Sequence, residues 1–94
     1  MNTLGLIRDR FARALTALGI AENEQPALLA MVLPSQDLKF GDYQANCAMP
    51  LGKRLGKPPR EIATDLLSRL EVGDVFDSPE IAGPGFINLR LKND

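Results

Sequence analysis

The strongest constraint on the fold is an alternating segment near the carboxyl end of the sequence, residues 82–92. Successive side chains of a β-strand point to opposite faces of its sheet, so this segment divides into two rows. One row, expected to face a core, is Ile87, Leu89 and Leu91, and the opposite row is Phe86, Asn88, Arg90 and Lys92. Gly83-Pro84-Gly85 precedes the strand, and its two glycines permit the positive φ angles of a tight hairpin turn. The segment therefore predicts an antiparallel hairpin with one apolar face and one mixed face.

The mixed row carries side chains that suit an unstacked RNA base. An aromatic ring such as Phe86 stacks on a base, an amide such as Asn88 pairs with a base edge, and the cations of Arg90 and Lys92 meet phosphate. An ordinary exposed strand face beside a hairpin could carry the same residues. From these residues alone, the row is a candidate RNA-binding surface with this plain alternative still open.

Apolar side chains at spacings of three and four predict three helices. The first covers about residues 3–18 and ends at Gly19. A shorter helix begins near Asn46, keeps Pro50 in its first turn, where a proline is tolerated, and ends at Gly56. Pro58-Pro59 opens the last helix. Its buried stripe is expected to consist of Ile62, Ala63, Leu66, Leu67 and Leu70.

Extended segments are expected at residues 28–33, at residues 38–43 and around Ile81, in addition to the final strand. Residues 22–26 are expected to form a polar linker before the first of these segments. The resulting order is α-β-β-α-α-β-β. The sequence therefore predicts an α+β fold of two layers, with a four-stranded antiparallel sheet and its helices on one face, in a single domain covering residues 1–94.

The sequence makes a different structural prediction for each of two glycines inside these elements. Gly41 lies within an extended segment and predicts a close approach of another backbone. Gly52 lies inside a helix, where glycine costs about 1 kcal/mol relative to alanine. On propensity alone, Gly52 should weaken its helix.

The composition excludes most catalytic chemistry. The sequence has no histidine and one cysteine, Cys47, so the usual general base, the His-dependent nucleophile pairs and the common zinc ligand set are missing. We interpret Cys47 as a small core residue. The apolar runs, such as residues 27–33, are too short to span a membrane, and the amino end has no signal-peptide pattern, so we expect a cytoplasmic protein.

The charges are unevenly distributed although the net charge is only −1. A basic zone contains Lys53, Arg54, Lys57 and Arg60, and an acidic zone contains Glu71, Asp74, Asp77 and Glu80. The basic zone is a secondary candidate for contacts with an RNA backbone, together with Lys92. Solvated helix surfaces of no functional meaning are an equally good interpretation of charge runs this short.

Two blocks of sequence, together with the final strand, resemble a known family. The blocks are Phe40-Gly41-Asp42-Tyr43-Gln44-Ala45-Asn46-Cys47-Ala48-Met49 and Leu55-Gly56-Lys57-Pro58-Pro59-Arg60-Glu61-Ile62-Ala63. From about Pro34 to Leu91 the chain resembles the N-terminal additional domain of arginyl-tRNA synthetase, a class I aminoacyl-tRNA synthetase, and it reads like the start of such an enzyme. The resemblance implies the same α+β fold.

The resemblance also implies a role for the mixed row. Domains of this family touch the D-loop near the elbow of the tRNA, and the matching positions here are Phe86, which would stack on a splayed base, and Asn88, which would pair with its edge. Gly83 marks a third contact position. The block from Phe40 to Asn46 is expected to be structural, with RNA contacts by Gln44 and Asn46 as the minor alternative.

The remaining expectations concern activity and partners. The implied activity is ATP-dependent arginylation of tRNA, and ATP, arginine and magnesium would belong to a catalytic domain outside this chain, because its His-x-Gly-His signature cannot occur without histidine. Neither glycine segment matches a phosphate loop, so we expect no cofactor here. The expected partners are arginine tRNA and the catalytic domain of the same protein, without DNA or membrane contacts and as a monomer. The rival hypothesis is a protein-docking module with no direct RNA recognition.

Overall fold

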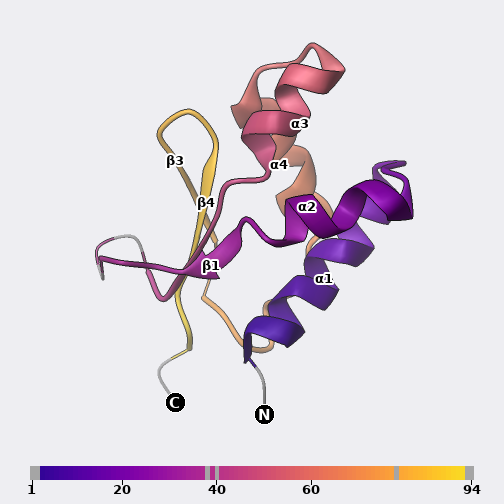
Figure 1. Ribbon diagram of the computed structural model, residues 1–94. Helices are drawn as coiled ribbons and strands as arrows, with labels where there is room; N and C mark the ends of the chain where they lie inside the picture. Colours follow the sequence, from indigo (N-terminus) through magenta and orange to yellow (C-terminus); the bar gives the residue numbers. More distant parts are fainter. Residues whose placement is uncertain (1–2, 38, 40, 78, 93–94) are drawn as a thin grey trace.

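The computed structural model describes residues 3–37, 39, 41–77 and 79–92. Along the chain the elements are α1 (Thr3–Ala17), the 3-10 helix η1 (Glu22–Glu24), α2 (Gln25–Leu29), β1 (Val32–Pro34), β2 (Tyr43–Ala45), α3 (Ala48–Leu55), α4 (Pro59–Arg69), β3 (Glu80–Ala82) and β4 (Phe86–Leu89). The strands form one sheet and the helices gather on one side of it (Figure 1). This arrangement confirms the predicted α+β class.

The sheet has the strand order β1-β2-β4-β3 and is antiparallel throughout. β4 is an inner strand that pairs with β2 on one side and with its hairpin partner β3 on the other. The register aligns Val32, Ala45, Ile87 and Ile81 across the four strands. Since the first three of these side chains have no exposed surface, this row faces the core.

The core lies between this face of the sheet and the helices. Alternate residues of β4, Ile87 and Leu89, are fully buried, as are Phe11 and Leu15 of α1 and Leu66 of α4. Cys47 is 1% exposed, which confirms its interpretation as a core residue, and burial raises the pKa of its thiol to about 11. The periodic apolar stripes of the sequence therefore do become the interior.

The chain between α1 and β1 differs from the prediction. Residues 22–26 form η1 and the start of α2 instead of a linker, and the expected strand at 28–33 is wrong for Leu28 and Leu29, which are helical. Gln25 explains the difference, because its buried side chain donates to Thr16 Oγ1 and to the Ile20 carbonyl, both at 3.0 Å. A five-residue helix is too short for its period to show in the sequence.

The segments around the second and last strands also need correction. The expected strand at 38–43 begins only at Tyr43, and Leu38 and Phe40 lie outside the described residues. Leu91 is 40% exposed and is not a core residue, because β4 ends at Leu89. Phe76 is 2% exposed and packs its ring edge-on to Tyr43, with centroids 6.1 Å apart. This buried aromatic lies in the acidic zone, where no core residue was expected.

Two glycines allow backbones to meet. Gly41 has a φ of +93°, and a Cβ there would lie 2.6 Å from the Leu89 carbonyl oxygen, which confirms the expected close approach. Gly52 is buried, and a Cβ there would lie 2.7 Å from the Lys57 carbonyl oxygen and 3.2 Å from Pro59 N. Gly52 is therefore needed for the packing of α3 against the start of α4, a role that its cost in helix propensity did not indicate.

We predict that Gly52→Ala destabilises the fold by about 1–3 kcal/mol, since the added methyl group meets backbone that must move. Gly73→Ala is the control, because nothing lies within 4 Å of the position of its Cβ. Urea unfolding of the three proteins measures the difference. An unchanged or raised free energy of unfolding for Gly52→Ala would show that helix propensity outweighs the clash.

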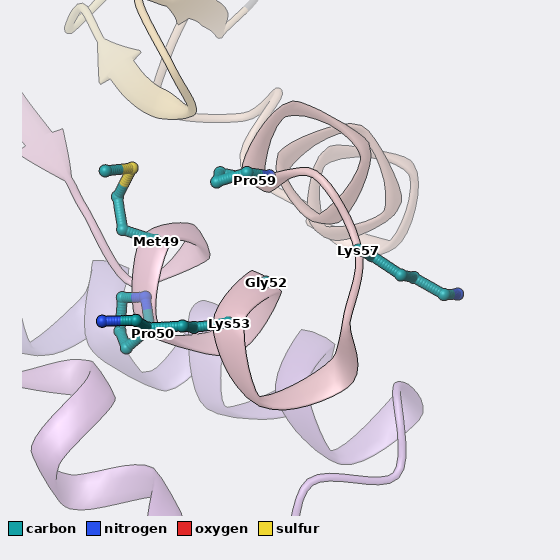
Figure 2. Close-up of a pocket in the computed structure, with 6 residues that line it drawn as sticks. All are labelled: Met49, Pro50, Gly52, Lys53, Lys57 and Pro59. Carbon is teal, nitrogen blue, oxygen red and sulfur yellow. The ribbon is translucent and has the colours of Figure 1, made fainter.

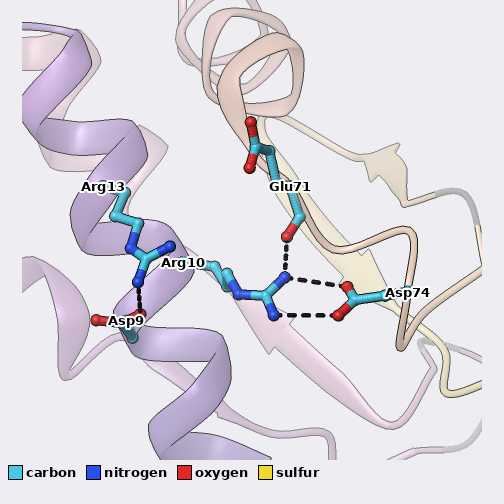
Figure 3. Close-up of polar contacts among 5 residues, drawn as sticks. All are labelled: Asp9, Arg10, Arg13, Glu71 and Asp74. Carbon is cyan, nitrogen blue, oxygen red and sulfur yellow. Dashed lines mark hydrogen bonds and ion pairs between the residues drawn. The ribbon is translucent and has the colours of Figure 1, made fainter.

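An ion pair joins α1 to the segment after α4. The Arg10 guanidinium binds both carboxylate oxygens of Asp74, at 3.0 and 3.1 Å, and also donates to the Glu71 carbonyl oxygen (Figure 3). Hydrogen bonds from Arg10 lower the pKa of Asp74. Part of the acidic zone therefore serves the fold by tying residues 71–74 to the first helix.

The same pair predicts an acid-sensitive contribution to stability. Because the pKa of Asp74 is lower in the folded than in the unfolded chain, the pair stabilises the fold above the ordinary aspartate pKa of about 3.9, and this is lost as pH falls through the folded pKa. Asp74→Asn should lower the urea midpoint at pH 7, and this difference from wild type should shrink as the pH falls below the ordinary aspartate pKa. Asp77→Asn, with no ion pair among the described residues, is the control. A difference from wild type that stays constant as the pH falls would contradict this assignment.

Candidate nucleic-acid interface

The face of the sheet opposite the helices carries the polar side chains. The register aligns Leu33, Gln44, Asn88 and Glu80 in one row across the four strands. Phe86 lies two residues before Asn88 on β4 and so shares this face. Leu33 is 51% exposed, in contrast to the fully buried Val32 beside it. The alternation of the strands therefore separates a core face from an outer face, as the sequence predicts.

A groove of about 530 Å³ runs over this outer face. It is lined by Met31, Leu33, Pro34, Gln36, Asp37, Gln44, Asn46 and Phe86. The Phe86 ring is half-buried, and its Cδ2 atom lies 3.4 Å from where a Cβ on Gly83 would be. The aromatic ring of Phe86 on β4, the amide of Gln44 on β2 and the amides of Gln36 and Asn46 in the adjoining loops thus share one concave surface.

Asn88 lies on this face but is not freely exposed. It is 7% exposed, and its Oδ1 accepts a hydrogen bond of 3.0 Å from Gln44 Nε2 on the neighbouring strand. The Asn88 amide, which was expected to be exposed on β4, is therefore buried and paired with the Gln44 amide on β2. Gln44 belongs to the same surface, and Asn46 nearby has a buried Oδ1 without a partner among the described residues.

The other residues of the candidate row lie beyond the groove. Arg90 follows the end of β4 and donates from Nη2 to the Lys39 carbonyl oxygen at 2.8 Å. Lys92 has an exposed side chain, and its backbone N–H donates to Val75 O at 2.9 Å. Gly83, with a φ of +55°, is exposed in the turn. None of these three residues lines the groove.

The basic zone of the sequence does not form one patch. Arg54 Nη2 lies 2.8 and 2.9 Å from the carboxylate oxygens of Glu24, and Arg60 Nη1 donates to the Gly83 carbonyl oxygen at 2.5 Å. Lys53 and Lys57 line a second pocket of about 500 Å³ between α3 and α4. Their side chains point in opposite directions (Figure 2). The four cations therefore have different surroundings and cannot act as a unit.

Comparison with known proteins identifies the family. Residues 5–91 match the family described as the arginyl tRNA synthetase N terminal domain. The chain belongs to this family. An arginine–tRNA ligase of Rhodopirellula baltica is 47% identical over 93 residues, which cover 99% of this chain and 13% of the relative. One of Thermosynechococcus vestitus is 48% identical over 88 residues, covering 93% and 14%. This arginyl-tRNA synthetase N-terminal domain thus spans about one seventh of each relative.

Solved structures show the same fold. The arginyl-tRNA synthetase of Thermus thermophilus superposes with a TM-score of 0.75 at 26% sequence identity, covering 97% of this chain and 14% of that chain. That of Plasmodium falciparum gives a TM-score of 0.76 at 23% identity, which supports the fold alone. Among the described residues, no helix of this N-terminal domain is long and apolar enough to cross a membrane.

Parts of the candidate interface could not be found in the sequence of the N-terminal domain. The contribution of Gln44 was only a minor alternative, since it depends on the pairing of β2 with β4. The contact between Arg60 and Gly83 joins residues 23 positions apart, and no local pattern indicates it. No signal in the sequence points to the exposure of Leu33, because residues 28–33 form a continuous apolar run that predicts a buried strand.

We expect the Gln44–Asn88 pair to contribute measurably to stability. A double-mutant cycle of Gln44→Ala and Asn88→Ala, followed by urea unfolding, should give a coupling free energy of about 0.5–1.5 kcal/mol, as for a hydrogen bond between partly buried neutral groups. A cycle of Gln44→Ala with Leu55→Ala, on α3, is the control and should show no coupling. Strict additivity of the first pair would mean that the two amides act separately.

Proposed function

We propose that this domain is the tRNA-binding appendage of an arginine–tRNA ligase and that its outer sheet face contacts a D-loop base near the elbow of arginine tRNA. The groove that joins Phe86 to the Gln44–Asn88 pair is the observation that carries the proposal. Ligation, with its ATP, magnesium and arginine, would belong to a catalytic domain of the same protein in the cytoplasm. The appendage would orient the tRNA for that reaction.

Phe86 would supply most of the affinity. A base stacked on an aromatic side chain gains about 1–3 kcal/mol, and every base has a face that can stack. The half-buried ring is supported by the turn at Gly83, so little side-chain entropy is lost on binding. Stacking alone does not distinguish bases, so selectivity needs the neighbouring amides.

The amide pair would read the base edge. With one hydrogen of Gln44 Nε2 donated to Asn88 Oδ1, Gln44 keeps an acceptor, Oε1, and a donor, its second Nε2 hydrogen. An acceptor beside a donor matches the Watson–Crick edge of a nucleobase. Since Asn88 is 7% exposed, we assign the outer contact to Gln44 and the support of its orientation to Asn88.

Cations outside the groove would meet the tRNA backbone. Arg90 is held by the Lys39 carbonyl oxygen beside the sheet, and Lys53, Lys57 and Lys92 have exposed side chains. Each phosphate contact adds affinity through counterion release without specifying sequence. With a net charge of −1, the domain should depend on few such contacts.

We predict that Phe86→Ala weakens binding of arginine tRNA about 5–150-fold, the equivalent of losing about 1–3 kcal/mol of stacking. Leu55→Ala is the control, since Leu55 is a 47% exposed apolar residue on α3 that does not line the groove. Amide chemical-shift titrations with arginine tRNA and with a tRNA altered only in its D-loop provide the measurement. Equal affinities for wild type and Phe86→Ala would refute base recognition by this face.

The rival function is docking of the outer face onto another domain. The observation in its favour is Leu33, which is 51% exposed on the same face as Phe86. Docking predicts that Leu33→Ala and Phe86→Ala both weaken association with a separately expressed ligase catalytic domain while tRNA affinity is unchanged. The two functions therefore give opposite patterns across the same variants.

A further inference from the structure

The start of α4 lies against the turn that joins β3 to β4. Gly85 shows how close the contact is, because a Cβ at this position would lie 2.8 Å from Pro59 Cβ and 3.0 Å from the Pro59 carbonyl carbon. The next residue of α4, Arg60, donates from Nη1 to the Gly83 carbonyl oxygen at 2.5 Å. Two adjacent residues of the helix thus hold two residues of the turn.

The same part of α4 is fixed from its other side. Gly52 of α3 packs on the Lys57 carbonyl oxygen and on Pro59, where a Cβ would come within 2.7–3.3 Å. Pro59 is therefore in close contact with both α3 and the turn. The helical layer provides a rigid support to which the Arg60 side chain can tie the turn.

The turn itself contains two glycines and is closed by one long backbone hydrogen bond. Gly83 and Gly85 both have positive φ, and the backbone hydrogen bond across the turn, from Gly85 N–H to the Ala82 carbonyl oxygen, is 3.3 Å long. The Phe86 ring packs over Gly83, with a 3.4 Å approach to its Cβ position. The orientation of Gly83 therefore bears directly on where the ring can lie.

We propose that Arg60 is a positioning residue for the outer sheet face. It fixes the β3–β4 turn through the Gly83 carbonyl oxygen and so orients Phe86. Its guanidinium does not bind an RNA phosphate. The proposal about tRNA rests on the function proposed above, whereas the effect on the turn does not. Arg60 is therefore an internal support of the turn and not the RNA contact that its place in the basic zone suggested.

The test compares Arg60→Met, which keeps an unbranched side chain but removes the charge and the donors, with Lys57→Met. Lys57 is an exposed cation three residues away, with no hydrogen bond or ion pair of its side chain among the described residues. Amide chemical shifts of Gly83, Gly85 and Phe86 are recorded first in the free domain. Affinity for arginine tRNA is then measured across a range of salt concentrations.

In the free domain, Arg60→Met should shift the three turn signals while signals of the α1 core, such as Phe11, stay in place. Lys57→Met should leave the turn signals unchanged. Unmoved turn signals in Arg60→Met would overturn the proposal whether or not the domain binds tRNA. This part of the test is therefore independent of the proposed function.

With tRNA, Arg60→Met should weaken binding several-fold with the slope of log affinity against log salt unchanged. Removing a phosphate contact would instead reduce that slope by about 0.7–0.9. A reduced slope for Arg60→Met would assign Arg60 to the RNA backbone and refute the positioning role. If wild type and Phe86→Ala fail equally to bind, the proposed function is wrong, and the shifts of the free domain still decide how Arg60 acts.

Discussion

The pairing of β4 on both of its edges is the interaction on which the rest of the structure depends. Its backbone bonds with β2 and β3 hold the sheet together, its Ile87 and Leu89 side chains form part of the core, and its Phe86 and Asn88 side chains face outward. One strand of four residues therefore determines both the stability and the candidate site. A shift of its register by one residue would bury the polar row and expose the apolar one.

Close backbone contacts complement the small core. The Gly41 position meets the Leu89 carbonyl, Gly52 meets the start of α4, and Gly85 meets Pro59. In a chain of 94 residues, which buries a smaller share of its surface than a large domain, such contacts allow layers to approach without intervening side chains. They also link α3, α4 and the turn beside Phe86 in one continuous series, so the packing of the helices has consequences for the outer face.

The sequence was sufficient for features that repeat over several turns or alternate along one strand. It predicted α1 and α4 from their apolar stripes, the α3 stop at Gly56, the close approach at Gly41 and the final hairpin. It failed for α2, which is too short to show a period, and for Leu91, since where a strand ends depends on its partners. In the site, it placed Phe86 on the outer face but missed the burial of Asn88, which depends on Gln44, 44 residues away.

The burial of the Cys47 thiol makes this domain suitable for site-specific labelling that would map its proposed binding to RNA. At pH 7–8 a thiol with a pKa of about 11 is almost wholly protonated, whereas an exposed cysteine has a pKa of about 8.5 and reacts readily. A single cysteine introduced at an exposed position such as Leu55 or Lys57 would therefore be modified selectively. The native chain, whose Cys47 is buried, would serve as the unreactive control. Spin labels or cross-linkers could then report how the domain approaches a nucleic acid without any residue of the core being replaced.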